Sequence, residues 1–192
     1  MYKVCKTEQS AARQRELEEG LLTLMLTRHY DEISVSDLCM QMNIPRKSFY
    51  RYFSGKDGAL HALIDHTLLE FEGFQISEKT SENQNYPIDL DRFFRFWLLQ
   101  KPLLDALERS GISGMLVTRS IDHALEDMGI QKRYLLQEDQ LIRHHATMFG
   151  VCGLMSMVLD WHHSGYEMSA RQMAQIAAQL LTRPLFSNVD MK

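Results

Sequence analysis

Residues 34–56 constrain the fold of this chain more than any other stretch, because they have the pattern of two short helices joined by a tight turn. Ser34 can cap the first helix by accepting hydrogen bonds from free backbone N–H groups, and Asp37 follows three residues later, as in a capping box. An apolar stripe with the i, i+3, i+4, i+7 spacing of one helix face follows, formed by Val35, Leu38, Cys39 and Met42. The pattern therefore predicts a helix that begins directly after Ser34.

Asn43 and Pro45 mark the turn and the start of the second helix. Asparagine tolerates the left-handed backbone conformation better than most residues. Proline suits the first turn of a helix, because the N–H that it lacks would have no partner there. At about 100° per residue, Phe49 and Phe53 would then share the inward face of a helix that extends to Phe53.

The outward face of this second helix is cationic. No acidic residue lies between Asp37 and Asp57, whereas four basic residues do, namely Arg46, Lys47, Arg51 and Lys56. Ser48 and Tyr50 flank the same face. A short helix that exposes cations, a hydroxyl and a phenol can approach a phosphate backbone and reach base edges, so the pair of helices has the features of a helix-turn-helix.

The remainder of the chain is predicted to be helical. It has 192 residues, of which 45% are hydrophobic, 24% are charged and only four are proline, which suits an all-α protein with an ample core. Apolar periodicity predicts helices over residues 8–29, 56 to the seventies, 88–100, 102–107, 115–128, 137–163 and 169–181. Residues 77–87 are polar and are expected to form a loop, and Gly129 is expected to end a helix.

Charge, cysteine content and the lack of long apolar runs bear on the partners and the location of the protein. The net charge of −4 gives no argument for nucleic-acid binding by the chain as a whole. Lys3 and Lys6 leave two readings open, because they belong either to a solvated helix end or to a surface that contacts phosphates. Three cysteines without a CxxC motif, no signal peptide and no long apolar run predict a cytoplasmic protein.

The ordered run S-V-S-D-L, followed by M-N-I-P-R-K-S-F-Y-R-Y-F-S-G-K-D, resembles the N-terminal region of the tetracycline-repressor (TetR) family of bacterial regulators. The resemblance covers roughly residues 10–64, and its most specific element is the Phe-Tyr-Arg-Tyr-Phe run at 49–53 with Lys56 after it. A run further along resembles regulators of the dihydroxyacetone-kinase type, through Phe149, Gly150, Gly153, Trp161, Gly165 and Ser169.

The TetR resemblance implies an all-helical homodimer with two functional regions. Residues 1–55 would form the DNA-binding head, a linking helix would start at about residue 56, and residues 56–192 would bind an effector and dimerise. The last two predicted helices are apolar over more than one face, which suits a subunit interface. The implied function is a repressor that a small-molecule effector releases from a palindromic DNA operator. The alternative is a DNA-binding protein whose helical body is a protein-interaction module without an effector.

The resemblance also assigns roles to individual residues. Tyr50, Tyr52 and Lys56 match phosphate contacts, whereas Arg46, Lys47 and Ser48 match positions that face base edges. Arg51 adds a cation to the same face, and Ser34 and Ser36 match contacts from the first of the two helices. Two residues depart from the family pattern, because Asn43 replaces the usual glycine of the turn and Lys47 replaces a small residue. The lysine makes the operator sequence unpredictable from relatives.

An apolar cavity in the body is the expected effector site. Its candidate lining residues are Phe93, Phe96, Trp97, Met115, His123, Met148, Cys152 and Met155. For any one of them taken singly, a position in the plain core is the favoured reading. A metal site is disfavoured, because the adjacent pairs His144–His145 and His162–His163 point about 100° apart on a helix. No glycine-rich phosphate loop, nucleophile elbow or catalytic carboxylate pair is present, so neither an enzyme nor a cofactor is expected.

Overall fold

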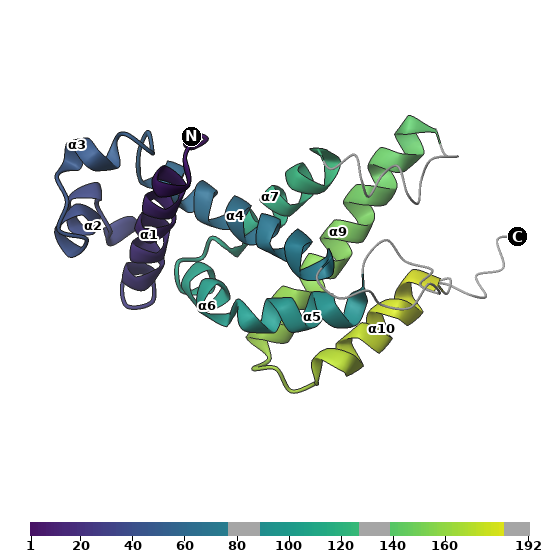
Figure 1. Ribbon diagram of the computed structural model, residues 1–192. Coiled ribbons are helices and arrows are strands. Elements are labelled where there is room, and N and C mark those ends of the chain that lie inside the picture. Colours follow the sequence, from purple (N-terminus) through teal and green to yellow (C-terminus); the bar gives the residue numbers. More distant parts are fainter. Residues whose placement is uncertain (77–88, 127–138, 183–192) are drawn as a thin grey trace, which may run out of the picture. The chain divides into compact units, whose positions relative to one another are not determined.

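The computed structural model describes residues 1–76, 89–126 and 139–182 (Figure 1). Within these ranges the chain forms nine α-helices and one short 3-10 helix, and it contains no β-strand beyond one isolated bridge between Tyr2 and Phe53. The predicted all-α class is therefore confirmed. None of the described helices combines the length and the apolar character needed to cross a bilayer.

The helices follow the predicted order. They are α1 (Glu8–Met25), η1 (Tyr30–Glu32), α2 (Val35–Gln41), α3 (Arg46–Phe49), α4 (Lys56–Ile76), α5 (Leu90–Leu99), α6 (Lys101–Arg109), α7 (Ser113–Glu126), α9 (Gln140–His163) and α10 (Ala170–Thr182). Two predicted ends are wrong. The first helix ends at Met25 rather than at His29, and α3 ends at Phe49 rather than at Phe53. The loop predicted at 77–87 and the helix end predicted at Gly129 lie outside the described residues.

The chain divides into two compact units. The first consists of residues 1–70 and 100–123, and the second of residues 71–99 and 124–192. The first unit thus contains α1 to α3, most of α4, α6 and most of α7. The functional boundary expected near residue 56 stays a prediction, because α4 runs through that position without interruption.

The first unit packs around α1, which contacts both α2 and α6. Its fully buried apolar side chains come from every helix of the unit and include Leu17, Leu21, Leu38, Phe49, Phe53, Leu60, Ile64, Leu104 and Leu116. Arg119 on α7 forms a two-pronged ion pair with Asp65 on α4, with 2.7 Å between Arg119 Nε and Asp65 Oδ1. The helices of this unit are therefore joined by apolar packing and by charge pairs, since Glu18 of α1 also pairs with His66 of α4 at 2.7 Å.

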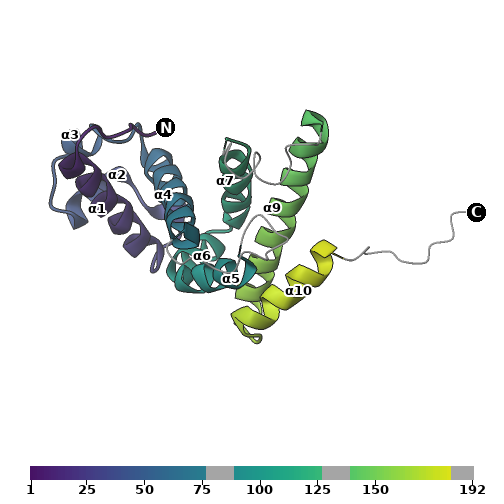
Figure 2. The same ribbon diagram turned by 45° about the vertical axis from the view of Figure 1, so that its right-hand side comes forward.

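An aromatic cluster organises the second unit. Phe71 at the end of α4 packs against Phe93 and Phe96 of α5, with ring centroids 5.6 Å and 5.3 Å apart. On the other side of α5, Phe94 meets Trp161 of α9 at 5.7 Å. The helices α5 and α10 lie side by side (Figure 1 and Figure 2). These buried rings are part of the apolar packing around α5.

A tight turn joins α9 to α10. Gly165 and Tyr166 both have positive φ angles, 74° and 62°, and the Tyr166 N–H donates to the Trp161 carbonyl at 2.9 Å. The Trp161 indole N–H donates to the carbonyl of Met168 at 2.8 Å, and its ring lies 4.9 Å from the ring of Tyr166. These contacts fix the direction in which the chain leaves α9.

Replacing Phe94 by alanine should lower the free energy of unfolding by about 3–5 kcal/mol, because the ring is fully buried and its removal leaves a cavity. The matched control is Leu99→Ala on the same helix, where the side chain is 66% exposed and the change should stay within about 0.5 kcal/mol. Urea titration followed by circular dichroism measures both. Equal losses in the two variants would contradict the packing described for α5.

Candidate nucleic-acid interface

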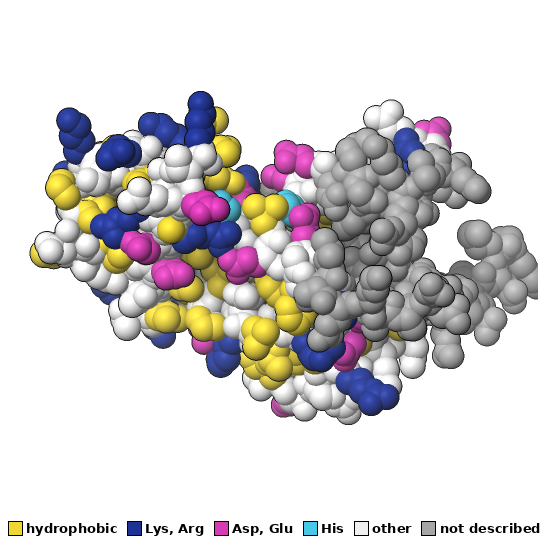
Figure 3. Space-filling view, viewed as in Figure 1, with side chains coloured by type: hydrophobic (Ala, Val, Ile, Leu, Met, Phe, Trp, Pro, Cys, Tyr) yellow, Lys and Arg dark blue, Asp and Glu magenta, His cyan; other side chains and the backbone are white. Residues whose placement is uncertain are grey.

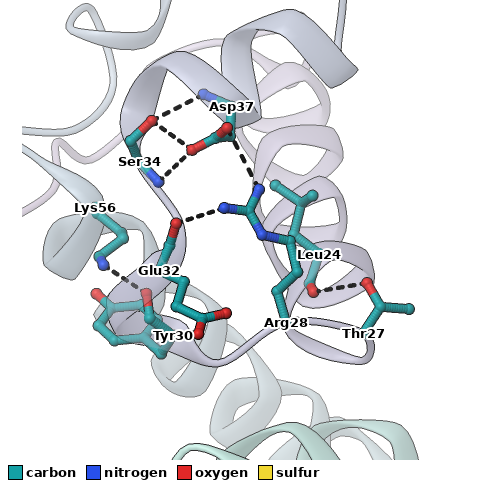
Figure 4. A network of polar contacts seen from close by, with 8 residues as sticks. All are labelled: Leu24, Thr27, Arg28, Tyr30, Glu32, Ser34, Asp37 and Lys56. Atoms are coloured by element: carbon teal, nitrogen blue, oxygen red, sulfur yellow. Dashed lines mark hydrogen bonds and ion pairs between the residues drawn. The ribbon is translucent and has the colours of Figure 1, made fainter.

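The N-terminus of α2 is closed by the predicted capping box. The Ser34 hydroxyl accepts a hydrogen bond from the Asp37 N–H at 3.1 Å, and the Asp37 carboxylate accepts from the Ser34 N–H at 2.7 Å (Figure 4). Arg28 lies 3.3 Å from the same carboxylate and also donates to the carbonyl of Glu32. Hydrogen bonds from the Ser34 hydroxyl and N–H, with Arg28 beside them, lower the pKa of Asp37 from 3.8 to about 2.

The turn between α2 and α3 has the predicted left-handed residue. Asn43 has a φ of 50°, and the N–H of Ile44 donates to the Cys39 carbonyl at 2.9 Å. Pro45 lies at the N-cap of α3, one position before the first helical turn where it was expected. The side chain of Phe49 is completely buried, so α3 is held by its apolar face and exposes the opposite one.

The structure places the predicted DNA contacts at or beside the exposed face of α3. Arg46, Lys47, Tyr50 and Arg51 are exposed, and Ser48 and Tyr52 are partly exposed. Ser34 and Ser36 are exposed at the start of α2, which packs against α3. In the described part of the chain no ion pair involves Lys47 or Arg51. Figure 3 shows dark blue side chains gathered over α3 and the segment before α1, with no acidic side chains among them.

Arg46 and Tyr50 are paired with each other on this face. The guanidinium donates to the Tyr50 hydroxyl at 3.3 Å and lies 6.0 Å from the centre of the ring. This hydrogen bond raises the pKa of Arg46. The two residues are one helical turn apart, and the hydrogen bond brings the phenol and the guanidinium together on the exposed face.

Lys56 has a structural partner that the sequence did not indicate. Its ammonium group donates to the Tyr30 carbonyl at 2.6 Å and lies 4.0 Å from the centre of the Tyr30 ring. The Tyr30 hydroxyl donates to the Asp57 carboxylate at 2.6 Å, and burial, with this bond, raises the pKa of Tyr30. Lys56 therefore joins η1 to the start of α4. Its predicted phosphate contact would use its remaining N–H donors.

Sequence reasoning also missed the attachment of the first residues. The N–H of Lys3 donates to the carbonyl of Tyr52 at 2.9 Å, and the N–H of Ser54 donates to the carbonyl of Met1 at 3.0 Å. Residues 1–6 are therefore not a frayed helix end, because they form an extended segment that precedes the Thr7 N-cap of α1. No local signal marks such pairing, since its partners lie some fifty positions apart.

The predicted lining residues of the effector site divide between the two units. Phe93, Phe96, Trp97, Met148, Cys152 and Met155 belong to the second unit, and Met115 and His123 to the first. Within the second unit, Trp97 contacts Phe93 at 6.4 Å and Phe96 at 5.5 Å, and all three are buried. Met148 and Cys152 are half-buried on α9. The lining of an effector cavity stays a prediction.

The histidines of α9 do not form a cluster with other ligating side chains. In the described ranges, no three His, Cys, Asp or Glu residues lie close enough together to hold a metal ion. His144 and His145 are exposed. His162, by contrast, is buried, and its Nδ1 lies 2.8 Å from the Tyr166 hydroxyl.

The fold is that of TetR-family transcriptional regulators, as the sequence resemblance implied. One similar structure is the fatty acid degradation regulator FadR from Bacillus halodurans, with 15% identity, a TM-score of 0.60 and coverage of 96% of this chain and 100% of that one. The dihydroxyacetone kinase operon activator DhaS shares 14% identity at a TM-score of 0.56, over 88% of this chain and 93% of that one.

The TetR family repressor AlkX from Dietzia sp. strain DQ12-45-1b shares 15% identity at a TM-score of 0.50, over 86% of this chain and 95% of that one. A scan against protein-family models finds no match, and no curated protein matches in sequence. At these identities the similarity establishes the fold, and the roles of individual residues rest on the geometry above.

Replacing Asp37 by asparagine should lower the urea midpoint at neutral pH, because the capping box loses its charged acceptor. The native carboxylate has a pKa below its ordinary value, so its stabilising effect is full above pH 3.8 and disappears as the pH falls towards 2. The difference in urea midpoint between wild type and the variant should therefore become smaller from pH 6 to pH 3. A gap that is constant over this range would contradict the assigned pKa. Asp31→Asn, an exposed neighbour, should leave the midpoint nearly unchanged.

Replacing Lys56 by methionine should lower the free energy of unfolding by about 1–3 kcal/mol, because the Tyr30 carbonyl and ring both lose the ammonium group. Lys47→Met is the matched control, since Lys47 is exposed and has no partner in the described residues. Thermal unfolding measured side by side separates the two. If both variants have the melting temperature of wild type, Lys56 does not hold η1 against α4.

Proposed function

We propose that this protein is a DNA-binding transcriptional regulator that reads its operator with α3. The observation that carries this proposal is the face of α3, where Arg46, Lys47, Tyr50 and Arg51 are exposed and no acidic residue intervenes. The fold, shared with regulators of transcription, supports the same function. This activity would take place in the cytoplasm, where the DNA lies.

Lys47 lies on α3 and Arg51 lies just after its C-terminal end, about one helical turn away. Both are free of ion pairs within the described part of the chain. They can therefore bind DNA without first breaking a contact. Arg46 and Ser48 lie on either side of Lys47 in α3, and these three residues would read the base edges. Tyr50 and Tyr52 would bind phosphates on either side and fix the register.

A dimer would form through α9 and α10. Both helices expose large apolar side chains, among them Leu141, Ile142, Phe149, Leu180 and Leu181, of which Phe149 is 69% exposed. Such a surface is costly to leave in water and suits an interface between two copies. Two copies would place two α3 helices in successive major grooves, on half-sites about 34–36 Å apart.

An effector would bind among the aromatic side chains of the second unit, near Phe93, Phe96 and Trp97. The indole N–H of Trp97 is buried and has no hydrogen-bond partner among the residues that the structure describes. An unpaired buried donor costs about 1–3 kcal/mol, which a ligand with an acceptor atom would recover. The expected effector is thus an apolar molecule with at least one acceptor, and it would act by releasing the DNA, as in a repressor.

Within the first unit, such a response would pass through α6. The N–H of Tyr30 donates to the Ser110 hydroxyl at 3.1 Å, which ties η1 to the C-terminal end of α6. Because α6 also packs on α1, a shift of α6 would move the elements that carry α2 and α3. The effector changes DNA affinity only by its difference in affinity for the two arrangements.

DNA binding should be measured with the DNA upstream of the protein's own gene, against a scrambled duplex, at several salt concentrations. Arg51→Ala should weaken binding to both duplexes and reduce the slope of log K against log salt by about one, because one phosphate contact is lost.

Lys47→Ala should instead change the preference among operator variants by about 1–3 kcal/mol at one position. Arg109→Ala on α6 is the control cation. Absence of selective, salt-dependent binding by wild type would refute the proposed function.

A screen for compounds that raise the melting temperature tests the effector. A binding compound should lose its effect in the Trp97→Phe variant if it accepts from the indole N–H, while Leu98→Ala, which changes an exposed neighbour, should bind normally. Selective DNA binding that no compound alters would favour the alternative, in which the body is a protein-interaction module.

A further inference from the structure

Residues 1–6 form an extended segment that the structure attaches to the C-terminal side of α3. Lys3 donates its N–H to Tyr52, and the Met1 carbonyl accepts from both the N–H and the hydroxyl of Ser54, the latter at 2.7 Å. Tyr2 and Phe53 form the bridge between these bonds. The segment thus has a fixed register against residues 52–54, which follow the exposed face of α3.

Two side chains of this segment, Tyr2 and Cys5, anchor it to the rest of the unit, and the others are exposed. The Tyr2 ring lies 5.7 Å from the ring of His66 on α4. Burial, together with the nearby Asp65 carboxylate that pairs with Arg119, raises the pKa of Tyr2 to about 12. Cys5 is half-buried and donates to Gln14 at 2.7 Å. These contacts leave the side chains of Lys3 and Lys6 pointing into solvent, where both are exposed.

Glycine at position 58 is required for this attachment. A Cβ atom built on Gly58 would lie 2.4 Å from the backbone carbonyl oxygen of Met1, a distance at which something must shift. The atom that it meets is backbone, which cannot turn aside as a flexible side chain could. Elsewhere on the same helix, Gly73 has no atom within 4 Å of such a Cβ.

The charge of the segment matches that of the α3 face. Its first seven positions contain Lys3 and Lys6 and no acidic residue. The backbone of Lys3 is bonded to Tyr52, a predicted phosphate contact, so its side chain starts from the edge of the α3 surface. Figure 3 shows dark blue side chains over both elements.

We infer that residues 1–6 are a pre-ordered second DNA-contacting element, in which Lys3 and Lys6 bind phosphates next to those held by Tyr52. The inference rests on the proposed function and adds a contact surface to it. A mobile arm would pay about 1–2 kcal/mol of backbone entropy for each residue ordered on the DNA. Here the anchors at Met1, Tyr2 and Cys5 order the backbone beforehand, so the two lysines can contribute their full counterion release.

Two kinds of variant test the element by different means. Lys3→Ala with Lys6→Ala removes the charges and keeps the anchors. Gly58→Ala keeps the charges and displaces the segment, although alanine is otherwise the better residue inside a helix. The matched controls are Lys101→Ala with Arg109→Ala, which removes two cations from α6, and Gly73→Ala, which makes the same exchange where space is open.

The double lysine variant should reduce the slope of log K against log salt by about two on both specific and scrambled duplexes. The Gly58→Ala variant should weaken binding by about tenfold or more, because the arm must then be ordered at the DNA. Both controls should bind as wild type does, and circular dichroism should show equal helix content in all five proteins.

The two proposals fail in different ways. If wild type binds DNA selectively but the double lysine variant keeps the wild-type salt slope, the role of the segment is structural only. This inference is then overturned, while the proposed function stands. Wild-type affinity in Gly58→Ala would likewise overturn the role of pre-ordering. If wild type shows no selective binding, the proposed function fails and this inference fails with it.

Discussion

The arrangement of the first unit depends on the contacts of Tyr30. Its N–H bonds to Ser110 at the end of α6, its carbonyl and ring hold Lys56 at the start of α4, and its hydroxyl bonds to Asp57. Every polar group of one buried residue is thereby used to join three elements. Because buried polar groups are costly when unpaired, any movement of one element must be followed by the others or lose a hydrogen bond. Such a junction favours a few discrete arrangements over gradual deformation.

A net charge of −4 is compatible with a DNA-binding surface because charge acts locally at the distances concerned. The Debye length at physiological salt is about 8 Å, so acidic residues elsewhere on the surface are largely screened from α3. Several of the acidic residues in the first unit are also engaged. Glu18 pairs with His66, Asp65 with Arg119, and Asp37 with Ser34 and Arg28. The cations of α3 therefore meet the solvent without nearby acidic competitors.

The parts of the fold that could be predicted from the sequence are those with short-range causes. The capping box at Ser34 and Asp37 spans three positions, the left-handed turn needs only Asn43, and the inward pair Phe49 and Phe53 follows from helical spacing. Even here the extent of α3 was overestimated. Phe53 is buried beyond the helix end and pairs with Tyr2, so a helical period predicted the correct burial for a partly wrong reason.

The contacts that could not be predicted join positions far apart in the chain. Tyr30 and Ser110 are 80 positions apart, and Ser54 and the carbonyl of Met1 are 53 apart. Neither end has a distinctive local pattern, since a tyrosine after a helix and a residue near the start of a chain are common. The predicted effector site has the same weakness. Its aromatic members on α5 were found from their density, whereas Met115 and His123 lie in the other unit.

Two chains of contacts connect the surface around α3 with the helices that follow α4. One passes from α6 through Ser110 to Tyr30 and Lys56. The other passes from α7 through Arg119 to Asp65 of α4, where the neighbouring His66 contacts the ring of Tyr2, which forms the bridge with Phe53. The first sets the position of the two-helix unit, and the second sets the position of the segment beside it. Because both chains include α4, a displacement of α4 relative to α6 and α7 would change both. If α3 and residues 1–6 bind DNA as proposed, such a displacement would disturb both sets of phosphate contacts together.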